Sequence, residues 1–184
     1  ALEIDSESEI ESTLGLDRSV LRADRVMATA VSALRTAVVQ IGAQRDQQSL
    51  TEALSGVGAS SVELYANINR SLFATDRTPP AFGEVAERAA RAGFRAFKCA
   101  PFDEVLLDAP SGPILETAGP GLDRVAAVRQ AIGPDARLQV DCHNRFAPDD
   151  AIVIAEKLAE LDVVWFEEPI RPARTPENLA WIAE

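Results

Sequence analysis

The sequence is short of residues that many kinds of site require. Its 184 residues include two cysteines, Cys99 and Cys142, one histidine and one tyrosine. The cysteines form no CxxC pair and do not have the spacing of a zinc site, which argues against a thiolate metal centre. Two thiols in a chain of this size are typical of a reducing compartment. We therefore expect a cytoplasmic protein.

Positive charge is also scarce. Eighteen Lys and Arg residues face 29 Asp and Glu residues, which gives a formal net charge of −11 and a pI of about 4.6. This balance predicts no nucleic-acid partner, because binding to phosphates needs clustered Lys and Arg. If the substrate is an anion, its site must supply local positive charge from lysines or from a metal ion.

Long apolar runs are missing too, and the first residues do not resemble a secretory leader. No run approaches the roughly 18 apolar residues of a membrane span. The first residues, "ALEIDSESEIES", lack the basic start and apolar core of a signal peptide. From these features we expect no membrane partner.

The sequence does contain a helical first part, followed by alternating strands and helices. Residues 19–47 carry an apolar stripe at helical spacing and are predicted to form one helix. The break "SGVGASS" that follows is the candidate domain boundary. After it, strands are predicted at 62–68, 94–100, 137–143 and 163–168, and helices at 79–93, 121–133, 148–161 and from Thr175, with Pro176 at its first position.

Repeated strand–helix units predict an α/β fold with a parallel sheet. Residues 101–120, rich in proline, glycine and acidic residues, are expected to form a loop or small lid over the end of the second strand. Two architectures fit the pattern: an open doubly wound sheet and an incomplete (β/α)8 barrel. A dinucleotide-binding fold is poorly supported, because "YANINRS" stands where a glycine-rich phosphate turn would follow the first strand.

Polar side chains recur at the carboxyl ends of three predicted strands. Alternation places Lys98 on the inner face of the second strand, Asp141 and His143 on that of the third, and Glu167 on that of the fourth. The carboxyl ends of neighbouring parallel strands meet at one rim. The helix-facing positions are then Phe97, Cys99, Leu138, Val140, Cys142, Val164 and Phe166, so both cysteines are predicted to be buried and reduced.

These four side chains form a coherent chemical set. Asp141 and Glu167 are oxygen ligands of the kind that suits Mg²⁺, and Lys98 adds a second positive group. His143 can donate or accept a proton near neutral pH. Each residue alone is more often structural, but their recurrence at one end of consecutive strands favours a site. A metal, an ammonium and an imidazole together are suited to removing a proton next to a carboxylate.

Five segments, in order, resemble a known family: "SALRTAVVQI", "LYANINR", "GFRAFK", "VDCHNRF" and "WFEEP". Over residues 28–184 the chain resembles the enolase superfamily, in its mandelate racemase/muconate-lactonising branch. The resemblance implies a (β/α)7β TIM-like barrel preceded by an α+β capping domain. Residues 1–60 would be a mostly helical remnant of the capping domain, and residues 61–184 the first half of the barrel. Because a third metal ligand would lie beyond Glu184, we expect a larger protein.

The resemblance also implies roles for residues. Asp141 and Glu167 match the first and second ligands of Mg²⁺, which in the family stabilises an enediolate. Lys98 matches the first lysine of a Lys-x-Lys motif, with Ala100 in place of the second; the alternative, in which Ala96 replaces the first, stays open. Asp141 and His143 resemble the Asp-x-His of acid-sugar dehydratases, where the histidine is the general acid for the departing hydroxide.

The function expected from this resemblance is that of a Mg²⁺-dependent dehydratase acting on an acid sugar, with Lys98 and His143 as catalytic residues. A racemase, epimerase or cycloisomerase of the same superfamily is the alternative reaction. A non-catalytic barrel that serves as a binding or scaffold domain is the alternative of another class. The expected partner is a small carboxylate substrate, and we expect a homo-oligomer.

Overall fold

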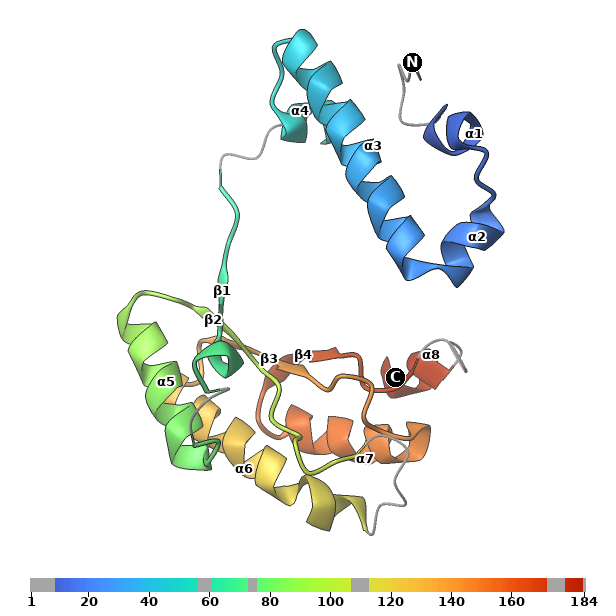
Figure 1. Ribbon diagram of the computed structural model, residues 1–184. Coiled ribbons are helices and arrows are strands. Elements are labelled where there is room, and N and C mark those ends of the chain that lie inside the picture. The colour runs from blue at the N-terminus through green and yellow to red at the C-terminus, as the bar shows by residue number, and fades with distance from the viewer. Residues whose placement is uncertain (1–8, 56–60, 73–75, 107–112, 172–177, 184) are drawn as a thin grey trace. The chain divides into compact units, whose positions relative to one another are not determined.

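A computed structural model describes residues 9–55, 61–72, 76–106, 113–171 and 178–183 (Figure 1). The chain divides into two compact units, Ala1–Val62 and Glu63–Glu184. The first unit is helical where it is described. The second contains a parallel sheet with helices, and it carries all four of the predicted site residues.

The first unit corrects the prediction of a single helix over residues 19–47. It contains the helices α1 (Ile10–Leu14), α2 (Arg18–Ala23), α3 (Arg25–Arg45) and α4 (Leu50–Ser55). Asp24 separates α2 from α3: its backbone is extended, and its carboxylate accepts hydrogen bonds from the amides of Val26 and Met27 at 2.9 and 3.0 Å. The helix breaks there because Asp24 is an N-cap, a role that the apolar stripe does not reveal.

Helix α3 is long and apolar enough, by length and composition alone, to cross a membrane. This differs from the expectation based on uninterrupted apolar runs, because the criterion averages hydropathy over an 18-residue window, in which many alanines and valines outweigh Arg35. One such helix is weak evidence for a membrane span, since core helices of soluble proteins meet the same criteria. Several of its apolar side chains are exposed: Val26, Leu34 and Ile41.

The second unit confirms the predicted α/β fold. The strands β1 (Tyr65–Asn67), β2 (Ala96–Cys99), β3 (Arg137–Asp141) and β4 (Val163–Glu167) pair in parallel in the order β1-β2-β3-β4. The helices are α5 (Pro79–Arg91), α6 (Ile114–Ile132), α7 (Pro148–Ala159) and α8 (Asn178–Ala183), with the 3-10 turn η2 (Ile68–Leu72) after β1. Figure 1 shows α5, α6 and α7 along one side of the sheet. Sequential strand order with helices on one side is the winding of a barrel, whereas a doubly wound sheet reverses its order.

The strand phase predicted from alternation holds along β2 and β3. Phe97, Cys99, Leu138, Val140 and Cys142 are all at most 1% exposed and pack in one core with the helices. Both cysteines are free and buried, as predicted. Burial raises the pKa of the Cys99 thiol to about 12 and also raises that of Cys142, so both thiols are neutral near pH 7.

The same phase is wrong at one position in β4. Val164 was assigned to the helix side but is 60% exposed, whereas Val163 and Phe166 pack against the core. The cause is an irregular register, in which Leu138 pairs with Val163 and Gln139 with Trp165, so Val164 has no partner on β3. Such a bulge shifts the alternation by one residue. Beyond it, Glu167 keeps the inner position that was predicted.

The segment 101–120 is only partly the loop that its composition predicted. Helix α6 begins at Ile114, so residues 114–120 are helical although Pro120 lies among them. Ile114 and Ala118 are buried, and burial of an apolar face overrides a local breaker. Residues 107–112, the centre of the predicted lid, lie outside the described residues, as do Thr175 and Pro176.

Candidate functional site

Three adjacent strands bring Lys98, Asp141 and Glu167 into contact. Asp141 and Glu167 end β3 and β4 and are register partners on these neighbouring strands. Lys98, from β2, donates to both carboxylate oxygens of Glu167, with Nζ 2.7 Å from Oε1 and 2.6 Å from Oε2. The same Nζ lies 3.2 Å from Oδ2 of Asp141. Strand pairing thus brings together residues that are 69 positions apart in the chain.

The ammonium of Lys98 lies between two negatively charged carboxylates. Its side chain is 13% exposed. Partial burial lowers the pKa of Lys98, but the hydrogen bonds and charges of Glu167 and Asp141 outweigh burial and raise it, so the ammonium stays charged. The ring of Tyr65 lies 5.6 Å from Nζ and adds a cation–π contact. The site therefore holds a cation between two carboxylates.

His143 reaches the same place by a different backbone route from the one predicted. The strand was expected to continue to residue 143, but β3 ends at Asp141. His143 and Asn144 then adopt left-handed conformations, with φ of 50° and 59°. The His143 amide donates to Oδ1 of Asp141 at 3.3 Å, and its Nε2 lies 3.3 Å from Oδ2 of that residue. The side chain is 53% exposed, so it can meet a ligand as well as Asp141.

Backbone hydrogen bonds fix the segments that follow β3 and β4. The amides of Cys142, Asn144 and Phe146 donate to the carbonyls of Glu167, Glu168 and Pro169 at 2.9, 2.7 and 3.1 Å. Glu168 also has a left-handed backbone, with φ of 45°. Left-handed residues other than glycine are strained and cluster at functional sites. These hydrogen bonds therefore fix the turns that follow Asp141 and Glu167 against each other.

A polar cleft of about 330 Å³ lies over these strand ends. Its lining includes three of the predicted residues, Lys98, Asp141 and His143, and also residues that the sequence reasoning did not select: Tyr65, Asn67, Asn69, Cys99 and Ala100. Asn67 and Asn69 come from the end of β1 and the turn after it. The alternation of asparagines in "ANIN", at the same end of the first strand, was the signal that could have pointed to them.

The donor set suits part of a Mg²⁺ site. Like charges directly opposite each other on neighbouring strands repel, and Lys98 supplies only one positive charge for two carboxylates. A divalent cation that takes oxygens from Asp141 and Glu167 would balance the pair, and Mg²⁺ commonly binds through one or two carboxylates with waters completing its shell. Within the described ranges, no group of three metal-ligating side chains is assembled.

Comparison with known proteins agrees with this geometry. Residues 81–184, more than half of the chain, match the family model described as enolase C-terminal domain-like. The chain belongs to the enolase superfamily. The sequential strand order is that of its TIM-like barrel, and the similar proteins place the chain in the mandelate racemase/muconate-lactonising branch.

Individual members of the superfamily are moderately similar. The D-galactarolactone cycloisomerase of Agrobacterium fabrum is 33% identical over 144 residues, 78% of this chain and 34% of that protein. The D-gluconate dehydratase of Thermoproteus tenax is 30% identical over 143 residues, 78% of this chain and 27% of that protein. The crystal structure of D-glucarate dehydratase from Agrobacterium tumefaciens complexed with magnesium aligns with a TM-score of 0.58 and 26% identity, over 74% of this chain and 34% of that chain. The chain therefore spans about a third of the length of these relatives.

Proposed function

We propose that this protein is a Mg²⁺-dependent dehydratase that removes the proton α to the carboxylate of a sugar acid and eliminates water. The observation that carries the proposal is the convergence of Lys98, Asp141, Glu167 and His143 at the carboxyl ends of three adjacent strands. Relatives named as sugar-acid dehydratases support the same reaction class.

In this proposal the two carboxylates and the lysine bind the metal and the substrate carboxylate. Asp141 and Glu167 would hold Mg²⁺, which when bound supplies positive charge to substrate oxygens. The charged Nζ of Lys98, only 3.2 Å from Asp141, is in position to bind a substrate carboxylate beside that metal. Fixed positive charge in a partly buried site stabilises the negative charge that develops when the α proton leaves.

His143 takes the second role, as the acid that protonates the departing hydroxide. Its imidazole borders the cleft and is half exposed, while Asp141 holds its Nε2 side at 3.3 Å. Imidazole is the side chain most often used for proton transfer in catalysis. Ala100, directly after β2, stands where the family motif has its second lysine, so the described strands supply no second lysine as a base. We therefore assign the role of proton donor to His143, which lines the cleft.

A cycloisomerase is the second candidate reaction, because the D-galactarolactone cycloisomerase is 33% identical over 78% of this chain. The two reactions differ in product. A dehydratase releases water and forms a 2-keto-3-deoxy acid, whereas a cycloisomerase opens or closes a ring without losing water.

The deciding experiment incubates the full-length protein and Mg²⁺ with a panel of aldonic acids, aldaric acids and their lactones. Products are assayed as 2-keto-3-deoxy acids, and α-proton exchange is followed by NMR in deuterated water. Loss of water from an open-chain acid to give a keto-deoxy acid supports the dehydratase. Ring opening without water loss supports the cycloisomerase. Neither product nor exchange with any acid would refute both and favour a non-catalytic binding domain.

Other features of the protein stay predictions. The cytoplasmic location, the homo-oligomer and the absence of nucleic-acid or membrane partners rest on composition and resemblance alone. The same holds for the assignment of residues 1–60 to a capping domain. Native mass spectrometry of the full-length protein would test the oligomeric state.

A further inference from the structure

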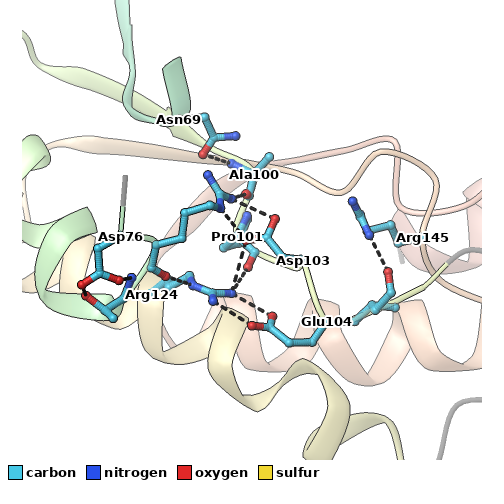
Figure 2. Close-up of polar contacts among 11 residues, drawn as sticks. Asn69, Asp76, Ala100, Pro101, Asp103, Glu104, Arg124 and Arg145 are labelled. Carbon is cyan, nitrogen blue, oxygen red and sulfur yellow. Dashed lines mark hydrogen bonds and ion pairs between the residues drawn. The ribbon is translucent and has the colours of Figure 1, made fainter. Parts of the chain in front are cut away.

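Three arginines converge on the segment that follows β2, two residues after Lys98 (Figure 2). Arg77 Nη2 donates to the carbonyl of Ala100 at 2.8 Å. Arg124 Nη1 donates to that of Pro101 at 2.6 Å, and Arg145 Nη1 to that of Val105 at 2.6 Å. The arginines come from the segment before α5, from α6 and from the turn after β3. They fix a stretch of backbone that borders the cleft.

The charges of this arginine cluster are not fully balanced. Arg77 binds Asp103 through Nε and Nη2 at 2.5 and 3.0 Å. Arg124 binds Glu104 through two parallel hydrogen bonds of 2.8 and 2.7 Å. Arg145 forms no ion pair with any carboxylate in the described part of the chain. In addition, Nη1 of Arg77 is buried and lacks a hydrogen-bond partner there. The cluster thus has one excess positive charge and an unused donor.

A small recess of about 90 Å³, here called the arginine recess, opens beside the polar cleft. Arg77 and Arg145 line it, and Asn69, Ala100, Asp141 and His143 border both the recess and the cleft. The short side chain of Ala100 therefore stands where the two spaces join. The recess has the volume of about three liquid water molecules, which is room for a carboxylate but not for a sugar ring.

The polar groups around the recess are mainly donors. Asn69 Oδ1 already accepts the Ala100 amide at 2.9 Å, which leaves the amide nitrogen of that side chain as its remaining polar group. Asp103 also lines the recess, but Arg77 occupies both of its oxygens. Asp141 contacts Lys98 and, in the proposed function, also binds Mg²⁺. A hydroxyl group would need an acceptor as well as a donor to be fully satisfied. A carboxylate accepts only, and arginine is the side chain best suited to it.

We propose that the arginine recess binds a second carboxylate of the substrate, at the end remote from the carboxylate held near Lys98. The substrate class is then a dicarboxylic (aldaric) sugar acid or its lactone, in preference to a monocarboxylic aldonic acid. This inference rests on the proposed function, because it places the reacting end of the substrate at Lys98, Asp141 and Glu167. Arg145 is the specificity-determining residue, and Ala100 keeps the passage open.

The test compares matched acids in the full-length protein with Mg²⁺. Galactarate and galactonate, and likewise glucarate and gluconate, share their stereocentres and differ only at the terminal carboxylate. Binding is measured by calorimetry and turnover by product formation. Arg145→Gln should weaken binding and raise KM for the aldarate by about 10–100-fold, the usual effect of losing a hydrogen bond to a charged group. The aldonate should change little, and Arg145→Lys should restore part of the preference.

Two further variants make the test specific. Ala100→Leu narrows the passage and should weaken the aldarate more than the aldonate, without removing the contact between Arg145 and Val105. Arg95→Gln is the matched control and should change the binding of neither acid. Arg95 is exposed, and within the described residues its side chain donates only to the neighbouring Phe94 carbonyl.

The outcomes separate this inference from the proposed function. Equal losses for both acids in Arg145→Gln would overturn the recess proposal and reduce Arg145 to a residue that positions the segment after β2. A wild-type preference for aldonates would overturn it as well, even if water is eliminated from them. If no acid is turned over but aldarates bind tighter in an Arg145-dependent way, the recess proposal stands and the dehydratase proposal fails.

Discussion

The two faces of β2 and β3 are built from alternate residues and have opposite properties. On the helix side, Phe97, Leu138 and Val140 are completely buried in an apolar core. On the other side, Lys98 and Asp141 contact each other within a polar cleft. Stability and chemistry thus belong to neighbouring positions in the same strand. Substitutions one residue apart should therefore affect different properties, and this contrast can be tested.

The largest expected effect on chemistry is at the two carboxylates. Asp141→Asn and Glu167→Gln should each abolish turnover and weaken Mg²⁺ binding, because each removes a charged oxygen ligand. Mg²⁺ affinity is measured by calorimetry and helix content by circular dichroism, which should be unchanged. Asp135→Asn and Glu84→Gln, at exposed positions, are the matched controls. Wild-type activity of either site variant at limiting Mg²⁺ would show that the ligand assignment is wrong.

The next effect separates His143 from Lys98. If His143 is the general acid, His143→Asn should lower dehydration by about 10²–10⁴-fold while the α proton still exchanges with deuterated solvent. Lys98→Met should instead reduce exchange and product together, because the ammonium supports the charge that both processes develop. NMR measures exchange and product in one sample. Loss of exchange in His143→Asn with intact metal binding would make His143 the base and favour the isomerase reading.

On the helix side of the strands the expected effect is on stability. Phe97→Ala should lower the free energy of unfolding by about 3–5 kcal/mol, because it leaves a cavity in the core. His143→Asn should change it by less than about 0.5 kcal/mol, since His143 is half exposed and asparagine tolerates its left-handed backbone. Urea unfolding followed by tryptophan fluorescence measures both. Similar losses in the two variants would contradict the separation of the two faces.

A smaller loss of stability is expected in α6. A Cβ added at Gly121 would lie 2.3 Å from Cδ1 of Phe102, a buried side chain in the segment that the arginines hold. Gly121→Ala should therefore cost about 1–3 kcal/mol through overpacking. Gly119→Ala is the matched control in the same helix, because nothing lies within 4 Å of its added Cβ. It should be neutral or stabilise by up to about 1 kcal/mol. Equal effects of the two would show that Phe102 moves aside.

Sequence periodicity predicted the parallel sheet, its helix-facing core and the shared rim of Lys98, Asp141 and Glu167. Alternation decides the face of each side chain, and repeated strand–helix units form parallel sheets. It did not predict the break at Asp24, the unpaired Val164 or the helical turns before Pro120, where a cap, a bulge and burial override the local pattern. The arginine recess was also missed. Arg77 and Arg145 are 68 positions apart, and no periodic pattern links a turn before one helix to the turn after another strand.

The smallest expected effect concerns the ion pair between Arg124 and Glu104, which holds the segment after β2 next to the arginine recess. The hydrogen bonds from Arg124 hold the pKa of Glu104 below its ordinary 4.5, against the effect of partial burial. The lowered pKa means that the folded state binds this proton more weakly than the unfolded state. The stabilisation is therefore present above pH 4.5 and is lost as the pH falls through the lower folded value. Glu104 is 36% exposed, so solvent screening limits the contribution to below about 1 kcal/mol.

Glu104→Gln should therefore lower the free energy of unfolding by this amount at neutral pH and by nothing in acid, as measured by urea unfolding across the pH range. A deficit that does not change with pH would mean that packing of the Glu104 side chain, and not its charge, holds Arg124 in place.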